Sequence, residues 1–242
     1  MLQKVARLMA LYADGQLGGD IMPEDANPGL DRGSAENYLF FTLPMALNYQ
    51  RNSYTLWQSA LSTYQDPGTR QIFSPRLVQT MPLELLAQLL TRYRLALQPN
   101  RQPVIWQTLC ASLMELFDGD VRNLFVHCAY SAGRIKAFLL ENKKRFPYLS
   151  GIKLSNYWLH VMQSYTDSTF KDRENISVAP DTHVIQASVK LGVVSPEQAA
   201  KSNAQSVVID SWETLLCGTA YQPIDVHTPL WLWSRGKFSV PL

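Results

Sequence analysis

The stretch FPYLSGIKLSNYWLHVM, residues 146–162, predicts a helix, a short turn and a second helix. The first helix is expected to end near Pro147, because proline cannot continue the helical hydrogen-bond pattern. Residues 149–151 then form the turn, and the second helix runs from about Lys153 to Tyr165. Backbone N–H groups at such a turn, together with the positive end of the second helix, can bind a phosphate group.

Helical spacing of apolar residues recurs elsewhere, whereas the alternation typical of strands is scarce. A stripe from Leu83 to Leu97 follows Pro82, and a second stripe from Ile105 to Leu116 precedes a DGD turn. Ser195 begins a capping-box pattern, with proline and then glutamine in the first helical turn. The sequence therefore predicts an all-α fold. We expect loops rich in turn residues at 15–33, 65–75, 98–103 and 167–180.

The chain of 242 residues is expected to fold as one cooperative unit. No flexible linker divides it, so any lobes must share their surfaces. We predict two packed lobes, approximately residues 82–165 and residues 1–81 together with 166–242.

Composition excludes several classes of protein. Hydrophobic residues make up 46% and charged residues 17%, which is too apolar for disorder. The three cysteines are far apart and the four histidines lack ligand spacing, so we expect neither a metal nor another cofactor. The N-terminal segment is interrupted by Lys4 and Arg7, which argues against a signal peptide or a membrane span. These features indicate a monomer in a reducing cytoplasm, associated with the nucleoid in a bacterium or archaeon.

Positive charge is concentrated around the predicted turn. The net charge is only +2, yet residues 134–153 carry six cations and the single acid Glu141. Such clustering fits contact with a polyanion such as a nucleic-acid backbone, and it also fits an ordinary solvated helix face.

Lys153 is placed at the start of the second helix, where the positive end of the macrodipole favours a neutral amine. A neutral amine is the nucleophile that Schiff-base chemistry requires. The alternative is a lysine that extends into solvent or touches a phosphate.

Asp181 lies in VAPDTHVIQASVKLGVV and is expected to begin a short helix that Gly192 closes. Val184, Ile185 and Leu191 would face inward from that helix. A role as N-cap explains the aspartate fully, and the same carboxylate can also stabilise a cation.

Two of these motifs resemble those of the helix-hairpin-helix superfamily of DNA glycosylases. Residues 149–153, LSGIK, resemble the hairpin and the lysine that opens the next helix in the lyase-active members. Residues 179–184, APDTHV, resemble the motif of the essential aspartate. The resemblance implies two helical lobes with an active-site cleft between them and a helix-hairpin-helix element that binds DNA.

The 28-residue spacing from Lys153 to Asp181 is similar to that of the archaeal 8-oxoguanine glycosylase/lyases. By this resemblance, further side chains would bind the base, namely Gln50, Tyr157, His160, Asp225 and Trp231. The DNA phosphates would be bound by Ser150, Gly151, Lys143, Lys144 and Arg145. The chain departs from the branch at His160, where a lysine is usual, and in lacking a second hairpin glycine.

The resemblance implies a bifunctional DNA N-glycosylase and AP lyase of base excision repair. It would excise oxidised guanine from damaged duplex DNA, with single-stranded DNA as an alternative substrate. Lys153 and Asp181 would be its catalytic residues. Two other functions stay open. One is an N-glycosidase for another modified purine or a deazaguanine nucleotide, because FFTLPMALNY mildly resembles the queuosine nucleotide glycosylases of this superfamily. The other is a DNA-binding protein without catalysis.

Overall fold

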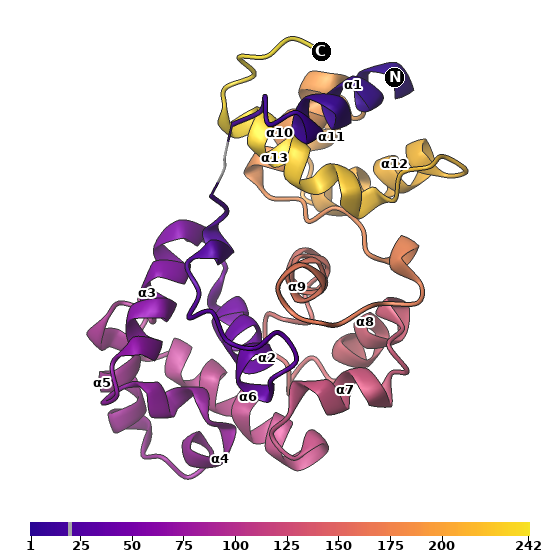
Figure 1. The fold of residues 1–242 in the computed structure, drawn as a ribbon. Helices are drawn as coiled ribbons and strands as arrows, with labels where there is room; N and C mark the ends of the chain where they lie inside the picture. The colour runs from indigo at the N-terminus through magenta and orange to yellow at the C-terminus, as the bar shows by residue number, and fades with distance from the viewer. Residues whose placement is uncertain (19–20) are drawn as a thin grey trace. The chain divides into compact units, whose positions relative to one another are not determined.

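The computed structural model describes residues 1–18 and 21–242, and all regular secondary structure in these residues is helical (Figure 1). The all-α prediction is therefore confirmed. The chain packs into two compact units. One is continuous, Met22–Lys171, and the other joins the two ends of the chain, Met1–Ile21 and Asp172–Leu242.

The continuous unit is built around α2, Ala35–Thr42, which follows the N-cap Ser34. Residues 37–42 are all buried, and the helix packs against α7, α9 and two short 3-10 turns. Phe40 and Phe41 of α2 both contact the fully buried Trp57. The other elements of this unit are η1 (Pro23–Asp25), η2 (Pro44–Leu47), α3 (Ser53–Gln65), η3 (Arg70–Phe73), α4 (Pro75–Val78), α5 (Leu83–Arg92), α6 (Gln102–Phe117), α7 (Val121–His127), α8 (Ala132–Glu141) and α9 (Ile152–Tyr165).

The discontinuous unit has α10, Thr182–Leu191, packed against α12 and α13. Trp212 of α12 is buried, and its indole N–H donates to the Ser188 hydroxyl of α10 at 2.8 Å. The N-terminal helix α1, Leu2–Ala13, contacts α13 within this unit. The remaining elements are η4 (Arg173–Asn175), α11 (Pro196–Ala199), α12 (Ala204–Leu216), η5 (Pro223–Val226) and α13 (His227–Arg235).

Several predicted helix ends are confirmed. Helix α6 ends at Asp118, which is left-handed with φ 53°, so the DGD turn closes it as expected. Helix α10 ends at Gly192 with φ 85°, the conformation that glycine adopts without steric cost. Helix α11 begins with the predicted capping box, in which Ser195 and Gln198 each hydrogen-bond the other's backbone N–H.

The helix predicted after Pro82 is shorter than its apolar stripe suggests. Helix α5 ends at Arg92, and Pro82 is its N-cap and not a residue of its first turn. Leu86 and Leu90 are fully buried, whereas Leu83 and Leu97 are exposed. The stripe from Leu83 to Leu97 was therefore wrong at both ends, because Leu83 is exposed and Leu97 lies beyond the end of the helix.

The predicted loops and lobes also differ in detail from the structure. The loop expected at 15–33 contains η1, while Gly19 and Asp20 lie outside the described residues. Residues 22–81, which we expected to join the C-terminal residues in one lobe, pack with residues 82–171. No helix among residues 1–18 and 21–242 is both long and apolar enough to cross a membrane.

Candidate functional site

The turn that precedes α9 is longer than predicted. Helix α8 ends at Glu141, not near Pro147, and residues 142–151 form consecutive turns. The left-handed residue in this connection is Tyr148, with φ 63°, whereas Gly151 has an extended conformation with φ −70°. Gly151 is needed for space, because a Cβ atom there would lie 3.1 Å from the Tyr148 carbonyl oxygen. The turn therefore depends on both residues.

Lys153 is the second residue of α9, after the N-cap Gly151 and Ile152, and so lies at the helix start that the sequence predicts. Its side chain is half-buried. Ser150, also half-buried, and the exposed Gly151 precede it in the turn. The amine therefore lies in the first turn of a 14-residue helix, where free backbone N–H groups are concentrated.

The three basic residues before the turn have different surroundings. Lys143 and Lys144 are exposed, as a phosphate-binding role requires. Arg145 instead makes a two-pronged ion pair with Glu115 of α6, with N–O distances of 2.7 and 2.8 Å. This hydrogen bonding lowers the pKa of Glu115. Arg145 must exchange Glu115 for a phosphate if it is to bind DNA as predicted.

Tyr157 contacts a buried acid that sequence reasoning missed. Its hydroxyl donates to Glu24 Oε1 at 2.6 Å, and Glu24 of η1 is only 2% exposed. Burial raises the pKa of Glu24 to about 7, against the opposing effect of the Tyr157 hydrogen bond. His160, half-buried one turn further along α9, has its ring centroid 6.4 Å from that of Tyr157. Glu24 lies in a PED turn without periodicity, so the sequence held no signal for this contact.

Gln50 is placed on the surface of the connection between η2 and α3. It is exposed and left-handed, with φ 50°. The neighbouring Asn48 is buried and its side-chain oxygen accepts a hydrogen bond from the Ser53 hydroxyl at 3.1 Å. A base-reading role for Gln50 therefore requires a base at this exposed position.

Asp181 is the N-cap of α10, as predicted, and accepts a hydrogen bond from the Val184 backbone N–H at 2.9 Å. Its second carboxylate oxygen accepts from the Trp231 indole N–H at 3.1 Å. The Arg235 guanidinium lies 5.0 Å from the centre of the Trp231 ring. The structure therefore brings together two residues that the sequence singled out separately, Asp181 and Trp231.

Asp225 has structural partners of its own. It forms an ion pair with Arg173 at 2.5 Å and accepts a hydrogen bond from the Gln222 backbone N–H at 2.8 Å. The second bond is half of a capping box that starts η5. Arg173 had no role in the sequence analysis, because its pairing with Asp225 joins residues 52 positions apart.

The predicted site residues are divided between the two units. The turn residues, Lys153, Tyr157, His160 and Gln50 belong to Met22–Lys171, whereas Asp181, Asp225 and Trp231 belong to the discontinuous unit. Among the described residues, no group of three or more His, Cys, Asp and Glu side chains is arranged to hold a metal ion.

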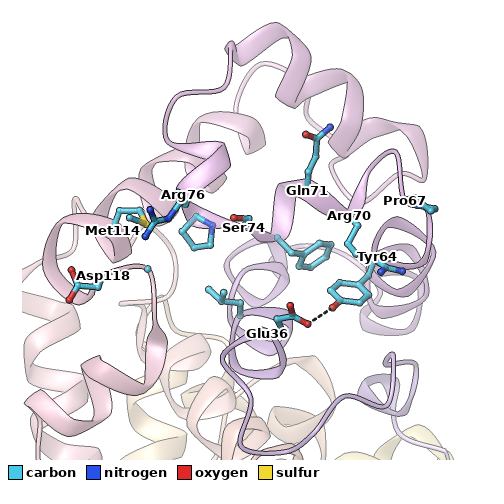
Figure 2. Close-up of a pocket in the computed structure, with 13 residues that line it drawn as sticks. Glu36, Tyr64, Pro67, Arg70, Gln71, Ser74, Arg76, Met114 and Asp118 are labelled. Carbon is cyan, nitrogen blue, oxygen red and sulfur yellow. Dashed lines mark hydrogen bonds between the residues drawn. The ribbon is translucent and has the colours of Figure 1, made fainter.

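A cavity of about 430 Å³ opens in the continuous unit (Figure 2). The Tyr64 hydroxyl donates to Glu36 at 3.2 Å across this cavity, and the Arg70 guanidinium lies 5.0 Å from the Tyr64 ring centre. Arg76 and Asp118 also line it, so charges of both signs surround an aromatic wall. None of the predicted site residues is among its lining residues.

Comparison of the whole chain with protein-family models found no match, and comparison with curated proteins found none either.

Proposed function

We propose that the protein is a DNA glycosylase with AP lyase activity that removes oxidised guanine. The observation that carries this proposal is the position of Lys153, in the first turn of α9 directly after the close turn at Gly151. Exposed Lys143 and Lys144 in the same connection supply positive charge for the DNA phosphates, with Ser150, Gly151 and Arg145 beside them.

The reaction begins with a base that has left the helical stack, since a paired base hides its glycosidic bond. The neutral amine of Lys153 attacks C1′ of the sugar, the C1′–N bond to the base breaks, and the base leaves with the bonding electrons and takes up a proton. Ring opening converts the resulting aminal into a Schiff base. Loss of the acidified C2′ proton then expels the 3′ phosphate and cleaves the strand.

Asp181 has the chemistry needed to stabilise the cationic sugar that forms during base loss. The Val184 and Trp231 N–H groups donate to its two oxygens and fix the orientation of the carboxylate. The same carboxylate can accept the proton that Lys153 loses on attack.

Base recognition is assigned to side chains with flat faces or amide groups. Tyr157 offers its ring face, because Glu24 already accepts a hydrogen bond from its hydroxyl. Trp231 offers its indole face, while Gln50, His160 and Asp225 offer hydrogen-bonding groups.

Trapping with borohydride tests the proposal directly. A duplex that contains 8-oxoguanine should form a covalent adduct with the wild-type chain when the Schiff base is reduced. Lys153→Gln should abolish the adduct, whereas Lys171→Gln, which changes an exposed lysine of the same unit, should not. Asp181→Asn retains a good helix N-cap and should slow base release by about 10²- to 10⁴-fold with little change in DNA affinity.

Other outcomes identify the alternatives. An adduct that persists in Lys153→Gln would remove this lysine from the reaction. Base release without trapping would indicate that water, not an amine, attacks the sugar. Cleavage of free modified nucleotides alone would support the nucleotide N-glycosidase, and binding without either reaction would support a DNA-binding protein.

A further inference from the structure

Two tyrosines from distant segments form a parallel stack on the continuous unit. The Tyr49 and Tyr148 ring centroids are 3.9 Å apart and the rings are inclined by only 5°. The Arg101 guanidinium lies 5.2 Å from the Tyr148 ring centre and 5.9 Å from that of Tyr49. We call Tyr49, Tyr148 and Arg101 the aromatic stack. Both rings are half-buried, so part of each aromatic surface is open to solvent.

The backbone holds Tyr148 in an unfavourable conformation. Its φ of 63° is left-handed, which is uncommon for a bulky side chain and costs free energy. The Gly151 backbone N–H donates to the Tyr148 carbonyl oxygen at 3.0 Å. Tyr49, the second ring of the stack, is held by a hydrogen bond: its hydroxyl donates to the Gln98 side-chain oxygen at 3.3 Å. Strain kept at a half-buried aromatic residue of this kind is typical of a binding site.

Three segments surround the aromatic stack, and none of them contains an acid. They are residues 48–53, 94–102 and 142–153. Arg51 joins the first two, because its guanidinium donates to the carbonyl groups of Leu95 and Arg94 at 2.7 and 3.3 Å. The segments carry these cations: Arg51, Arg94, Arg101, Lys143, Lys144, Arg145 and Lys153.

Within the described part of the chain, Arg145 is the only one of these cations that forms a salt bridge with an acid. Burial and the nearby charge of Arg94 both lower the pKa of Arg51, so like charges have been brought together here. A site that gathers cations around open aromatic faces suits a ligand that is a polyanion and also carries flat rings. Unpaired nucleic-acid strands have this chemistry at every nucleotide, whereas a peptide made of Asp and Glu alone lacks the rings.

We infer that the aromatic stack is a platform on which an unstacked base of single-stranded DNA rests, while the surrounding cations bind the adjoining phosphates. The inference rests on the proposed function for the choice of DNA. The inference adds that the DNA bound beside the turn before Lys153 is single-stranded.

Binding of a short fluorescein-labelled oligothymidylate, followed by anisotropy, tests the platform. The measurements use Lys153→Gln as the parent, so no reaction interferes. Tyr148→Leu should weaken binding by about 5- to 100-fold, as loss of one stacked base predicts. Tyr148→Phe keeps the ring and should bind within about twofold of the parent, since stacking needs no hydroxyl.

A matched control exists in the same unit. Tyr93 is also half-buried beside an arginine, with the Arg92 guanidinium 5.6 Å from its ring centre, but its hydroxyl donates to Asp66. Tyr93→Leu should leave binding unchanged. If Tyr148→Leu unfolds, Arg101→Gln takes its place, because it should weaken binding while both rings remain.

Three results would overturn the inference. They are unchanged binding in both Tyr148→Leu and Arg101→Gln, an equal loss in Tyr93→Leu, and poly-glutamate competing as well as the oligothymidylate. A base analogue whose fluorescence falls on stacking, 2-aminopurine, should be quenched by the parent and not by Tyr148→Leu. Loss of trapping with binding intact would remove the proposed reaction but leave the platform in place.

Discussion

Glu24 carries a carboxyl group that is 2% exposed and accepts a hydrogen bond from the Tyr157 hydroxyl. Besides burial, three neighbouring residues influence its pKa: hydrogen bonding by Tyr157 of α9 and Trp57 of α3 lowers it, and the charge of Asp25 of η1 raises it. Burial disfavours the charged form, so the folded chain holds a proton at this position up to a pH of about 7.

The buried Glu24 carboxyl makes the free energy of unfolding fall as the pH rises. The unfolded carboxyl ionises near its usual pKa of 4.5, whereas the folded one ionises near 7. Between those values the folded state binds more protons, so the free energy of unfolding decreases with pH, by roughly 3 kcal/mol in all. Glu24→Gln removes this loss and keeps an acceptor for Tyr157. Urea unfolding of both proteins from pH 4 to pH 8 measures the difference.

The control for that experiment is Glu36→Gln, which changes an exposed carboxyl of the same unit. Its unfolding curves should follow the wild type at each pH. Parallel pH profiles for Glu24→Gln and the wild type would show that the buried carboxyl does not titrate in this range.

Asp181 shows that a structural role and a chemical role need not exclude each other. The carboxylate caps α10 through the Val184 N–H, and this bond alone explains an aspartate at the position. Trp231 adds a second donor from α13, which no capping pattern requires. The second bond is the feature that separates Asp181 from an ordinary N-cap.

At the scale of elements, the connection from α8 to α9 depends on a close approach of backbone atoms. A Cβ on Gly151 would lie 3.1 Å from the Tyr148 carbonyl oxygen, and this oxygen is backbone and cannot turn away. Gly151→Ala should therefore destabilise the protein by about 1 kcal/mol and reduce affinity for DNA. Thermal unfolding and anisotropy measure the two effects.

Ser150→Ala is the control, because residue 150 already carries a Cβ and its change adds no atom to the turn. Its unfolding temperature should stay close to that of the wild type. A Gly151→Ala protein as stable as the wild type would show that the turn tolerates the added methyl group.

Helix boundaries could be predicted where the signal was local. Ser195 and Asp181 cap their helices through their own side chains, and Gly192 ends α10 by its backbone freedom. The turn before α9 was placed correctly at Gly151, but the end of α8 was not. Residues 142–146 look helical in composition, yet α8 ends at Glu141, and the side chain of the C-cap Asn142 donates to the Phe138 carbonyl at 2.9 Å.

The partners of the candidate site residues were less predictable than their positions. Lys153 at a helix start and Asp181 as N-cap follow from neighbouring residues in the chain. Glu24 beside Tyr157 and Arg173 beside Asp225 join residues 133 and 52 positions apart. Such pairs are set by how helices pack, and no spacing rule in one sequence gives them.

At the scale of the whole molecule, the two ends of the chain fold into one unit. Val5 and Leu8 of α1 are fully buried, and α1 packs against α13. Leu8→Ala should therefore lower the free energy of unfolding of this unit by about 2–5 kcal/mol, because it leaves a cavity beneath α1. The effect should reach α13, which is more than 200 positions away in the sequence.

Hydrogen exchange followed by mass spectrometry measures where this loss falls. Amides of α10 and α13 should exchange faster in Leu8→Ala than in the wild type. Leu85→Ala, at an exposed leucine of α5, is the control and should change neither helix. Unaltered exchange in α13 of Leu8→Ala would mean that α1 does not support it.

The same arrangement imposes an order on biosynthesis. A ribosome releases α1 before α13, so the helix that α1 packs against is translated more than 200 residues later. The residues from Met22 to Lys171 can condense while translation continues, since their partners are contiguous. Until α13 has been translated, the apolar side of α1 stays exposed to solvent. Chaperones that bind nascent chains would bind this side of α1.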